Sequence, residues 1–143
     1  MKFLFSLIVL LSLSTAASAQ TALDEQIELV RQSAATDRKI ILMGNMTFTS
    51  DESANFWPAW NEYRAAVAAN GDRTLALIKN FAANYESMTD QKAQEILTDH
   101  FSIEMQNIVI KQKFAQEINK FMPAQKVMRV IQIENKLDAA IDL

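Results

Sequence analysis

The chain has no cysteine, only two glycines and two prolines, and a single histidine. Without cysteine it cannot form a disulfide or offer a thiolate as a nucleophile or metal ligand. Glycine and proline supply most tight turns, so their scarcity argues against a fold of many short strands. Ala, Leu, Glu, Gln, Lys and Met are frequent instead, and these residues favour helices. We therefore predict an all-α fold that packing alone stabilises.

The first 19 residues have the pattern of a signal peptide. Lys2 provides a positive charge, residues 3–13 are mostly apolar, and Ala17-Ser18-Ala19 offers the small residues that signal peptidase accepts. We predict cleavage before Gln20 and export from the cytoplasm. An uncleaved N-terminal anchor is the alternative, although the apolar run is shorter than the roughly 20 residues of a spanning helix.

Residues 20–143 are expected to form a single helical domain with no membrane span. Cleavage removes one base, Lys2, and no acid, so the net charge changes from −3 to −4. A mildly acidic chain with scattered charges has no basic patch for nucleic acid, and we predict no nucleic-acid partner.

Apolar side chains recur every three or four residues, which is the period of an amphipathic helix. The spacing predicts about four helices, over residues 22–43, 50–86, 89–121 and 123–141. We expect the two long ones to form an antiparallel hairpin or an elongated bundle. Gly44 is expected to end the first helix, and Thr49 with Glu52 matches a capping box for the second. Residues 39–43 are also compatible with a short strand.

The second predicted helix is long because its apolar stripe keeps its phase through Asn70-Gly71-Asp72. A turn at these residues would have no reason to preserve the phase. Because Asn-Gly favours turns, two helices separated at Asn70-Gly71 remain the alternative. Pro58 is expected to bend the helix.

The sequence offers little for catalysis, and we predict that the protein is not an enzyme. There is no glycine-rich phosphate loop, and His100 has no serine or carboxylate arrangement around it that resembles a catalytic triad. We predict no catalytic residues and no cofactor.

Metal binding has one weak candidate pair, His100 and Glu104, which lie one helical turn apart. Two ligands fall short of the four of a structural zinc site, so a histidine paired with a carboxylate is the simpler interpretation. Met43 and Met46 invite a copper interpretation, although methionine more often fills gaps between helices.

The most distinctive stretch runs from Phe56 to Tyr63 and includes Trp57 and Trp60. Trp57 points away from the line that joins the other three aromatic residues. Two interpretations stay open. The four residues either anchor the core where helices meet, or form an exposed aromatic patch that binds a partner.

The last two predicted helices add two further expectations. The apolar side of the third helix is widened by Leu97, Phe101, Met105 and Ile108, so part of it remains for a second copy or a client protein. The last helix has a dense polar set: Arg129, Gln132, Glu134, Asn135, Lys136 and Asp138. We interpret this set as a solvated face, with Glu134 paired to an arginine or lysine.

Four segments resemble a group of short secreted proteobacterial proteins of uncharacterised function. They are Phe56-Trp57-Pro58 through Glu62-Tyr63, Ala76-Leu77-Ile78-Lys79, Met88-Thr89-Asp90 and Gln132-Ile133-Glu134-Asn135-Lys136-Leu137-Asp138. More loosely, the plan resembles the periplasmic Spy/CpxP-type proteins, whose helices start at Leu-Thr-x-x-Gln. The nearest segments here are Met88-Thr89-Asp90-Gln91 and Phe48-Thr49-Ser50-Asp51. That resemblance implies a thin helical hairpin in the periplasm, often a dimer, with a role as a chaperone or in envelope stress.

These observations together predict a non-enzymatic periplasmic protein that binds protein clients or a partner protein, with a homodimer as a further expectation. Its candidate binding residues are Phe56, Trp57, Trp60 and Tyr63. A protein that senses a small ligand or a metal is the alternative function.

Overall fold

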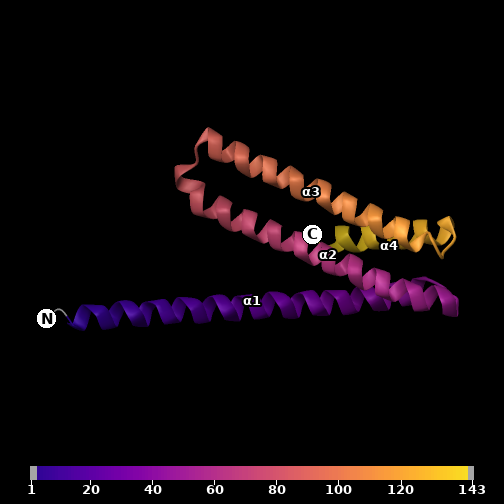
Figure 1. The fold of residues 1–143 in the computed structure, drawn as a ribbon, viewed down its shortest axis with the longest axis horizontal. Coiled ribbons are helices and arrows are strands. Elements are labelled where there is room, and N and C mark those ends of the chain that lie inside the picture. Colours follow the sequence, from indigo (N-terminus) through magenta and orange to yellow (C-terminus); the bar gives the residue numbers. More distant parts are fainter. Residues whose placement is uncertain (1–2, 142–143) are drawn as a thin grey trace. The chain divides into compact units, whose positions relative to one another are not determined.

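The computed structural model describes residues 3–141, with side chains described for Thr21 and for residues 24–140. Within that part of the chain there are four α-helices, one short 3-10 helix and no strand, which confirms the predicted all-α class (Figure 1). The elements are α1 (Phe3–Asn45), α2 (Ser50–Asn84), η1 (Tyr85–Ser87), α3 (Asp90–Ile118) and α4 (Ala124–Ile141). The 35-residue α2 and the 29-residue α3 are the two long helices of the predicted hairpin.

The chain divides into two compact units, Met1–Ile40 and Ile41–Leu143, and each is described by itself. The described part of the first is helix α1 as far as Ile40. We predicted that this helix starts at Ala22, whereas α1 starts at Phe3, because no glycine or proline interrupts the sequence after that residue. The predicted single domain over residues 20–143 includes parts of both units and stays a prediction.

The end of α1 corrects a second expectation. We predicted that Gly44 caps the helix, but Gly44 lies inside its last turn and has no positive φ angle. The helix ends one residue later, at Asn45, whose side-chain amide donates to the carbonyl oxygen of Ile41 at 2.8 Å. That hydrogen bond satisfies one of the terminal carbonyl groups, so no left-handed glycine is needed.

Helix α2 begins with the predicted capping box. The Glu52 amide donates to the Thr49 hydroxyl at 3.2 Å, and the Thr49 amide donates to the Glu52 carboxylate at 2.8 Å. Pro58 lies inside the helix and cannot donate to the carbonyl of Ala54. The two hydrogen bonds at the N-terminus fix where the helix starts.

Helix α2 is continuous through Asn70-Gly71. The predicted long helix is therefore confirmed, and the alternative prediction of two helices separated at these residues is wrong. Asn70 is 3 % exposed, and its amide donates to the backbone oxygen of Ile103 at 2.9 Å and to the Asn107 side chain at 2.7 Å. Its own oxygen accepts from Arg73 at 3.1 Å. Asn70 therefore links α2 to α3 instead of starting a turn.

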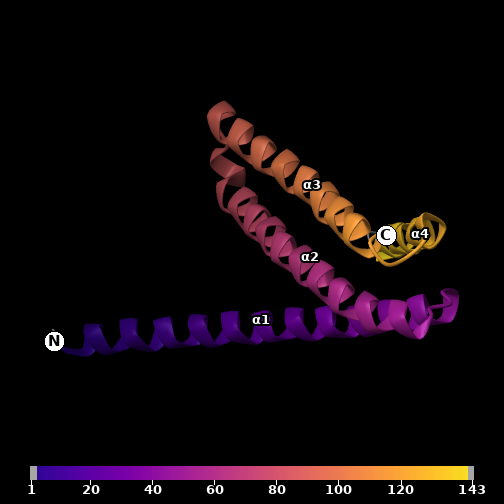
Figure 2. The same ribbon diagram turned by 45° about the vertical axis from the view of Figure 1, so that its right-hand side comes forward.

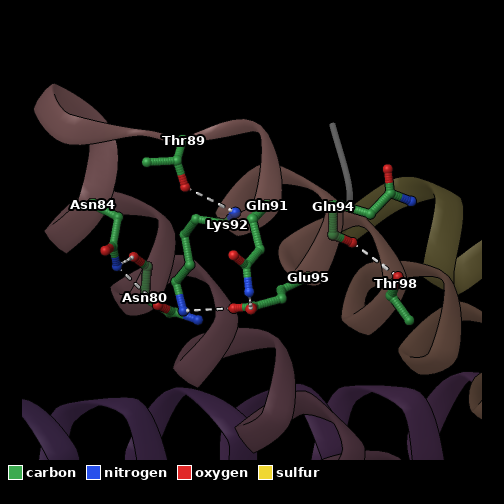
Figure 3. A network of polar contacts seen from close by, with 8 residues as sticks. All are labelled: Asn80, Asn84, Thr89, Gln91, Lys92, Gln94, Glu95 and Thr98. Carbon is green, nitrogen blue, oxygen red and sulfur yellow. Dashed lines mark hydrogen bonds and ion pairs between the residues drawn. The ribbon is translucent and has the colours of Figure 1, made fainter.

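Helices α2 and α3 lie side by side and run in opposite directions (Figures 1 and 2). Figure 3 shows polar contacts on both sides of the connection between them, within the end of α2 and within the start of α3. The Thr89 hydroxyl caps α3 by accepting from the Lys92 amide at 3.1 Å. Farther along, the Lys92 ammonium and the Gln91 amide both reach the carboxylate of Glu95.

Helix α3 ends at Ile118, three residues before the predicted end at Phe121. The residue before a proline is disfavoured in the helical region, and Pro123 therefore requires the chain to leave the helix ahead of it. The Pro123 carbonyl then accepts from the amides of Lys126 and Val127, which starts α4.

Helices α2, α3 and α4 enclose the core of the second unit. The Tyr63 and Phe114 rings stack there, with centroids 4.4 Å apart and planes 9° apart. The buried apolar side chains are Leu42, Phe56, Trp60, Tyr63, Ile103, Ile110, Phe114, Ile118, Met122, Val127, Val130 and Ile133. Ile103 and Ile110 of α3 lie seven residues apart, which is the spacing of its buried face.

Candidate functional site

The structure places most of the predicted aromatic site in the core. Phe56, Trp60 and Tyr63 are 0 %, 3 % and 4 % exposed. Trp57 is half-buried, and its indole donates to the Ser53 hydroxyl at 3.2 Å. Its ring packs edge-on against those of Phe56 and Trp60. Three of the four residues therefore anchor the helices and are not available as an exposed patch.

A buried polar contact joins α2 to α4 beside this aromatic cluster. Glu134 is 0 % exposed and accepts a hydrogen bond of 3.0 Å from the Trp60 indole. Its second carboxylate oxygen lies 3.6 Å from the guanidinium of Arg64. A buried carboxylate requires such partners, because removing it from water without them costs on the order of several kcal/mol even after the protein relaxes. The pairing of Glu134 with an arginine was predicted, but its complete burial was not.

A second contact joins the N-terminal ends of the same two helices. The Lys126 ammonium donates to the Glu52 carboxylate, which also caps α2. The hydrogen bond from Lys126, followed by that from the Thr49 amide, lowers the pKa of Glu52 below its usual value. Helix α4 is thus held to one side of α2 by two carboxylates, Glu52 and Glu134.

Opposite α4, the hairpin has an open face with an apolar groove. Trp60 and Arg64 contact α4, whereas Ala59 and Ala66 line the groove. Because successive residues of a helix are rotated by about 100°, these two pairs lie on opposite flanks of α2. The groove has a volume of about 210 Å³. It is lined by Ala59, Glu62, Tyr63, Ala66, Gln106, Val109, Ile110, Lys113, Phe114 and Glu117.

The floor of the groove is formed by core residues and its width is set by small ones. Tyr63 and Phe114, which stack on each other, line the groove together with the alanines of α2 and Val109 of α3. The side chains of Ala59 and Ala66 are too short to fill the space above the rings. The groove therefore exists because two alanines stand where larger residues would close it.

Charged side chains form the rim. Lys113 of α3 and Glu62 of α2 lie 3.6 Å apart across the mouth, with side chains 77 % and 75 % exposed. Such an exposed ion pair contributes no more than about 1 kcal/mol, so it does not block entry to the groove. Glu117 pairs with Lys120, just beyond the end of α3. A partner that enters the groove therefore contacts an apolar floor and a rim of positively and negatively charged side chains.

Of the predicted site residues, only Tyr63 belongs to this groove. The alanines were not predicted, although two alanines seven residues apart beside an aromatic stripe are the sequence signal that could have revealed them.

The weak metal candidates are not brought together with other ligands. His100 and Glu104 are both exposed, and the His100 ring lies 5.4 Å from that of Phe101. In the described part of the chain, no three His, Asp or Glu side chains are grouped as a metal site would require. Met43 is exposed and Met46 is half-buried.

In the part of the chain whose side chains are described, Thr21 and residues 24–140, we find no helix whose length and apolarity would suffice for a membrane span. Comparisons of the chain with protein-family models, with curated proteins and with solved structures find no match. The resemblance to Spy/CpxP-type proteins stays a prediction.

Proposed function

We propose that this is an exported, non-enzymatic helical protein that binds apolar segments of other proteins, as a periplasmic chaperone or an envelope-stress accessory does. The observation that carries the proposal is the groove between α2 and α3, on the side of the hairpin that α4 leaves open. Its apolar floor offers burial to a partner, and its rim carries charged side chains of both signs.

The size of the groove favours a protein side chain over a free ligand. Small-molecule sites usually have volumes of about 300–1,000 Å³, whereas this groove has about 210 Å³. An apolar cavity of about 150 Å³ holds a benzene molecule. The groove therefore has room for one large apolar side chain, such as a Leu or Phe anchor on a partner helix or an extended segment.

Two neighbouring alanines allow a matched test of this groove. Ala66 lines it, whereas Ala65 is exposed on the outer side of α2. Ala66→Gln puts a polar side chain in the groove, and Ala65→Gln makes the same change outside it. Losing the burial of one apolar anchor costs about 1.5–3 kcal/mol, so we expect Ala66→Gln to bind clients at least tenfold more weakly.

Binding is measured as suppression of light scattering when urea-denatured citrate synthase is diluted into buffer with increasing amounts of the protein. The unchanged protein and Ala65→Gln should suppress aggregation equally, and Ala66→Gln should fail at the same concentrations. Equal suppression by both variants would place client binding elsewhere. No suppression by the unchanged protein at a tenfold excess would refute the proposal, and a thermal shift with a divalent or cuprous ion would then favour the sensing alternative.

Export is tested separately. When the whole 143-residue chain is expressed in a Gram-negative bacterium, we expect the protein recovered from the periplasm to have the mass of residues 20–143. Ala19→Arg should block cleavage, because signal peptidase requires a small residue there, and should leave a membrane-associated chain of full length. An uncleaved protein in the cytoplasm would show that residues 1–19 are not a signal peptide.

A further inference from the structure

Helix α4 covers only part of one face of the α2–α3 hairpin. At about 1.5 Å per residue, the 18 residues of α4 span about 27 Å, whereas the 35 residues of α2 span about 52 Å. Figures 1 and 2 show α4 beside the half of the hairpin that lies away from the connection between α2 and α3. Near the end of α4, Asp138 pairs with Lys111 of α3 at 2.8 Å. The same face of the hairpin therefore continues beyond α4.

Three large apolar side chains at the end of α2 lie on this continuation. Ile78, Phe81 and Tyr85 are 58 %, 46 % and 67 % exposed, and the rings of Phe81 and Tyr85 lie 5.6 Å apart. Multiples of seven residues return a side chain to nearly the same side of a helix, within about 20° per seven residues. Ile78 follows Arg64 by fourteen residues, and Phe81 follows Trp60 by twenty-one. Because Arg64 and Trp60 contact α4, the three apolar residues share the face that α4 covers.

Helix α3 adds a fourth apolar side chain at the same level. The two helices are antiparallel, and Asn70 of α2 hydrogen-bonds to Asn107 of α3. Eleven residues forward from Asn70 to Phe81 therefore correspond to eleven residues back along α3, which lead to position 96. Leu97, next to that position, is 49 % exposed and precedes Lys111, a contact of α4, by fourteen residues. Leu97 thus lies beside the apolar residues of α2 on the same face.

The exposed area of these four residues suits a small protein interface. We call Ile78, Phe81, Tyr85 and Leu97 the tip surface. A large side chain has about 150–250 Å² to bury, so four that are about half exposed offer roughly 400 Å². Apolar patches of that size on a monomer often bind a partner. The adjoining part of this face is covered by a helix, α4, so the tip surface suits a helix that lies in line with it.

A charge beside the tip surface indicates which residue the bound helix carries at its end. Glu104 lies midway between Leu97 and Lys111, seven residues from each, and therefore between the tip surface and the end of α4. Lys111 holds the acidic Asp138 of α4. Glu104 is exposed and makes no ion pair within the part of the chain that the structure describes. The carbonyl end of α4 adds partial negative charge nearby, so a lysine or arginine is complementary to this position.

We propose that the tip surface binds an amphipathic helix of another protein, which lies in line with α4 and places a basic residue against Glu104. The site continues the interface that α4 forms with the hairpin. It lies on the opposite face from the groove and does not depend on client binding there. An interface of this size belongs to the weak and reversible class.

The test uses a fluorescein-labelled peptide about as long as α4, with leucine at every third or fourth position and a lysine at each end of the leucine line. Binding is measured by fluorescence anisotropy at neutral pH, in an Ala66→Gln background so that the groove does not contribute. We expect saturable binding. Leu97→Gln should weaken it about fivefold, because about half of the burial of a leucine is lost.

Met105→Gln is the matched control on the same helix. Met105 is 66 % exposed and lies two residues from the buried Ile103, which places it about 160° around α3 from the core. It faces away from the tip surface, so the affinity for the peptide should stay the same. Circular dichroism confirms that each variant keeps its helices. No binding, or an equal loss from Leu97→Gln and Met105→Gln, would overturn the proposal.

Charge exchange tests the place of the basic residue. Glu104→Lys should weaken binding of the lysine peptide and strengthen binding of a peptide with glutamates in place of the lysines. Each change should be about two- to fivefold, because an exposed ion pair contributes up to about 1 kcal/mol. Equal affinities of Glu104→Lys for the two peptides would overturn the contact with Glu104.

Two further outcomes would overturn the identity of the occupant. A proline in the middle of the peptide prevents the helix, and we expect it to abolish binding. An unchanged affinity would show that the bound segment is not helical. A dimer of the protein that Leu97→Gln dissociates, detected by sedimentation equilibrium without peptide, would show that a second copy occupies the tip surface.

Discussion

Phe56→Ala should lower the free energy of unfolding by about 3–5 kcal/mol, the range for removing a buried aromatic ring. Phe56 is 0 % exposed, and its ring lies 4.6 Å from that of Phe48 and 6.0 Å from that of Phe114. The substitution leaves a cavity where the start of α2 meets α3 and the segment before α2. Since domains of this size are stable by only about 5–15 kcal/mol, the loss should be visible as a large fall in the urea midpoint.

Phe101→Ala is the matched control, because it makes the same change at a ring that is 61 % exposed. It should alter the stability by less than about 0.5 kcal/mol. If Phe56→Ala does not fold, Phe56→Leu creates a smaller cavity and should still destabilise measurably. Equal effects at positions 56 and 101 would show that the aromatic run from residue 56 is not the core anchor.

The helix starts could be predicted because their causes are local. The side chains of Thr49 and Thr89 each accept a hydrogen bond from the amide three residues ahead. Both partners of such a hydrogen bond lie within four consecutive residues, so the sequence pattern contains them. The continuity of α2 at Asn70 was predicted from the phase of its apolar stripe. The reason for it, the hydrogen bonds to Ile103 and Asn107, depends on residues more than thirty positions away.

The candidate site could not be predicted in the same way. Whether an aromatic residue is buried depends on which flank of the hairpin α4 covers, and the periodicity of α2 alone does not contain that information. Trp60 and Tyr63 were therefore left open between the core and a surface patch. The groove was missed because it depends on what Ala59 and Ala66 lack, and the spacing of two small side chains is a weaker signal than a stripe of large apolar ones.

The apolar residues of helix α3 were predicted from the sequence, but their division into a buried side and an exposed side was not. Its sequence predicted an apolar side too broad for one packing partner, and the structure divides that side in two. The isoleucines at positions 103 and 110 pack toward α2, while Phe101, Met105 and Ile108 remain exposed. The sequence pattern contains both sides of this helix, but only the structure shows which of its apolar residues are buried and which are exposed.

Glu134→Ala should destabilise the protein by about 3–5 kcal/mol, although it enlarges no exposed apolar surface and removes no ring. Glu134 is 0 % exposed, and its loss leaves the Trp60 indole without this acceptor and Arg64 without this counter-charge. Glu134→Gln should cost less, because the amide oxygen can still accept from the indole. The two variants, compared by urea unfolding, separate the hydrogen bond from the charge.

A double-mutant cycle with Trp60→Phe decides whether the contact between α2 and α4 acts as we infer. Trp60→Phe keeps an aromatic ring but removes the donor, so the cost of Glu134→Ala should be smaller in the Trp60→Phe background than in the unchanged protein. We expect a coupling of about 1.5–3 kcal/mol, typical of a hydrogen bond to a charged group. Additive effects would mean that Glu134 stabilises α4 through its other contacts, and the hydrogen bond of 3.0 Å would then be incidental to the position of that helix.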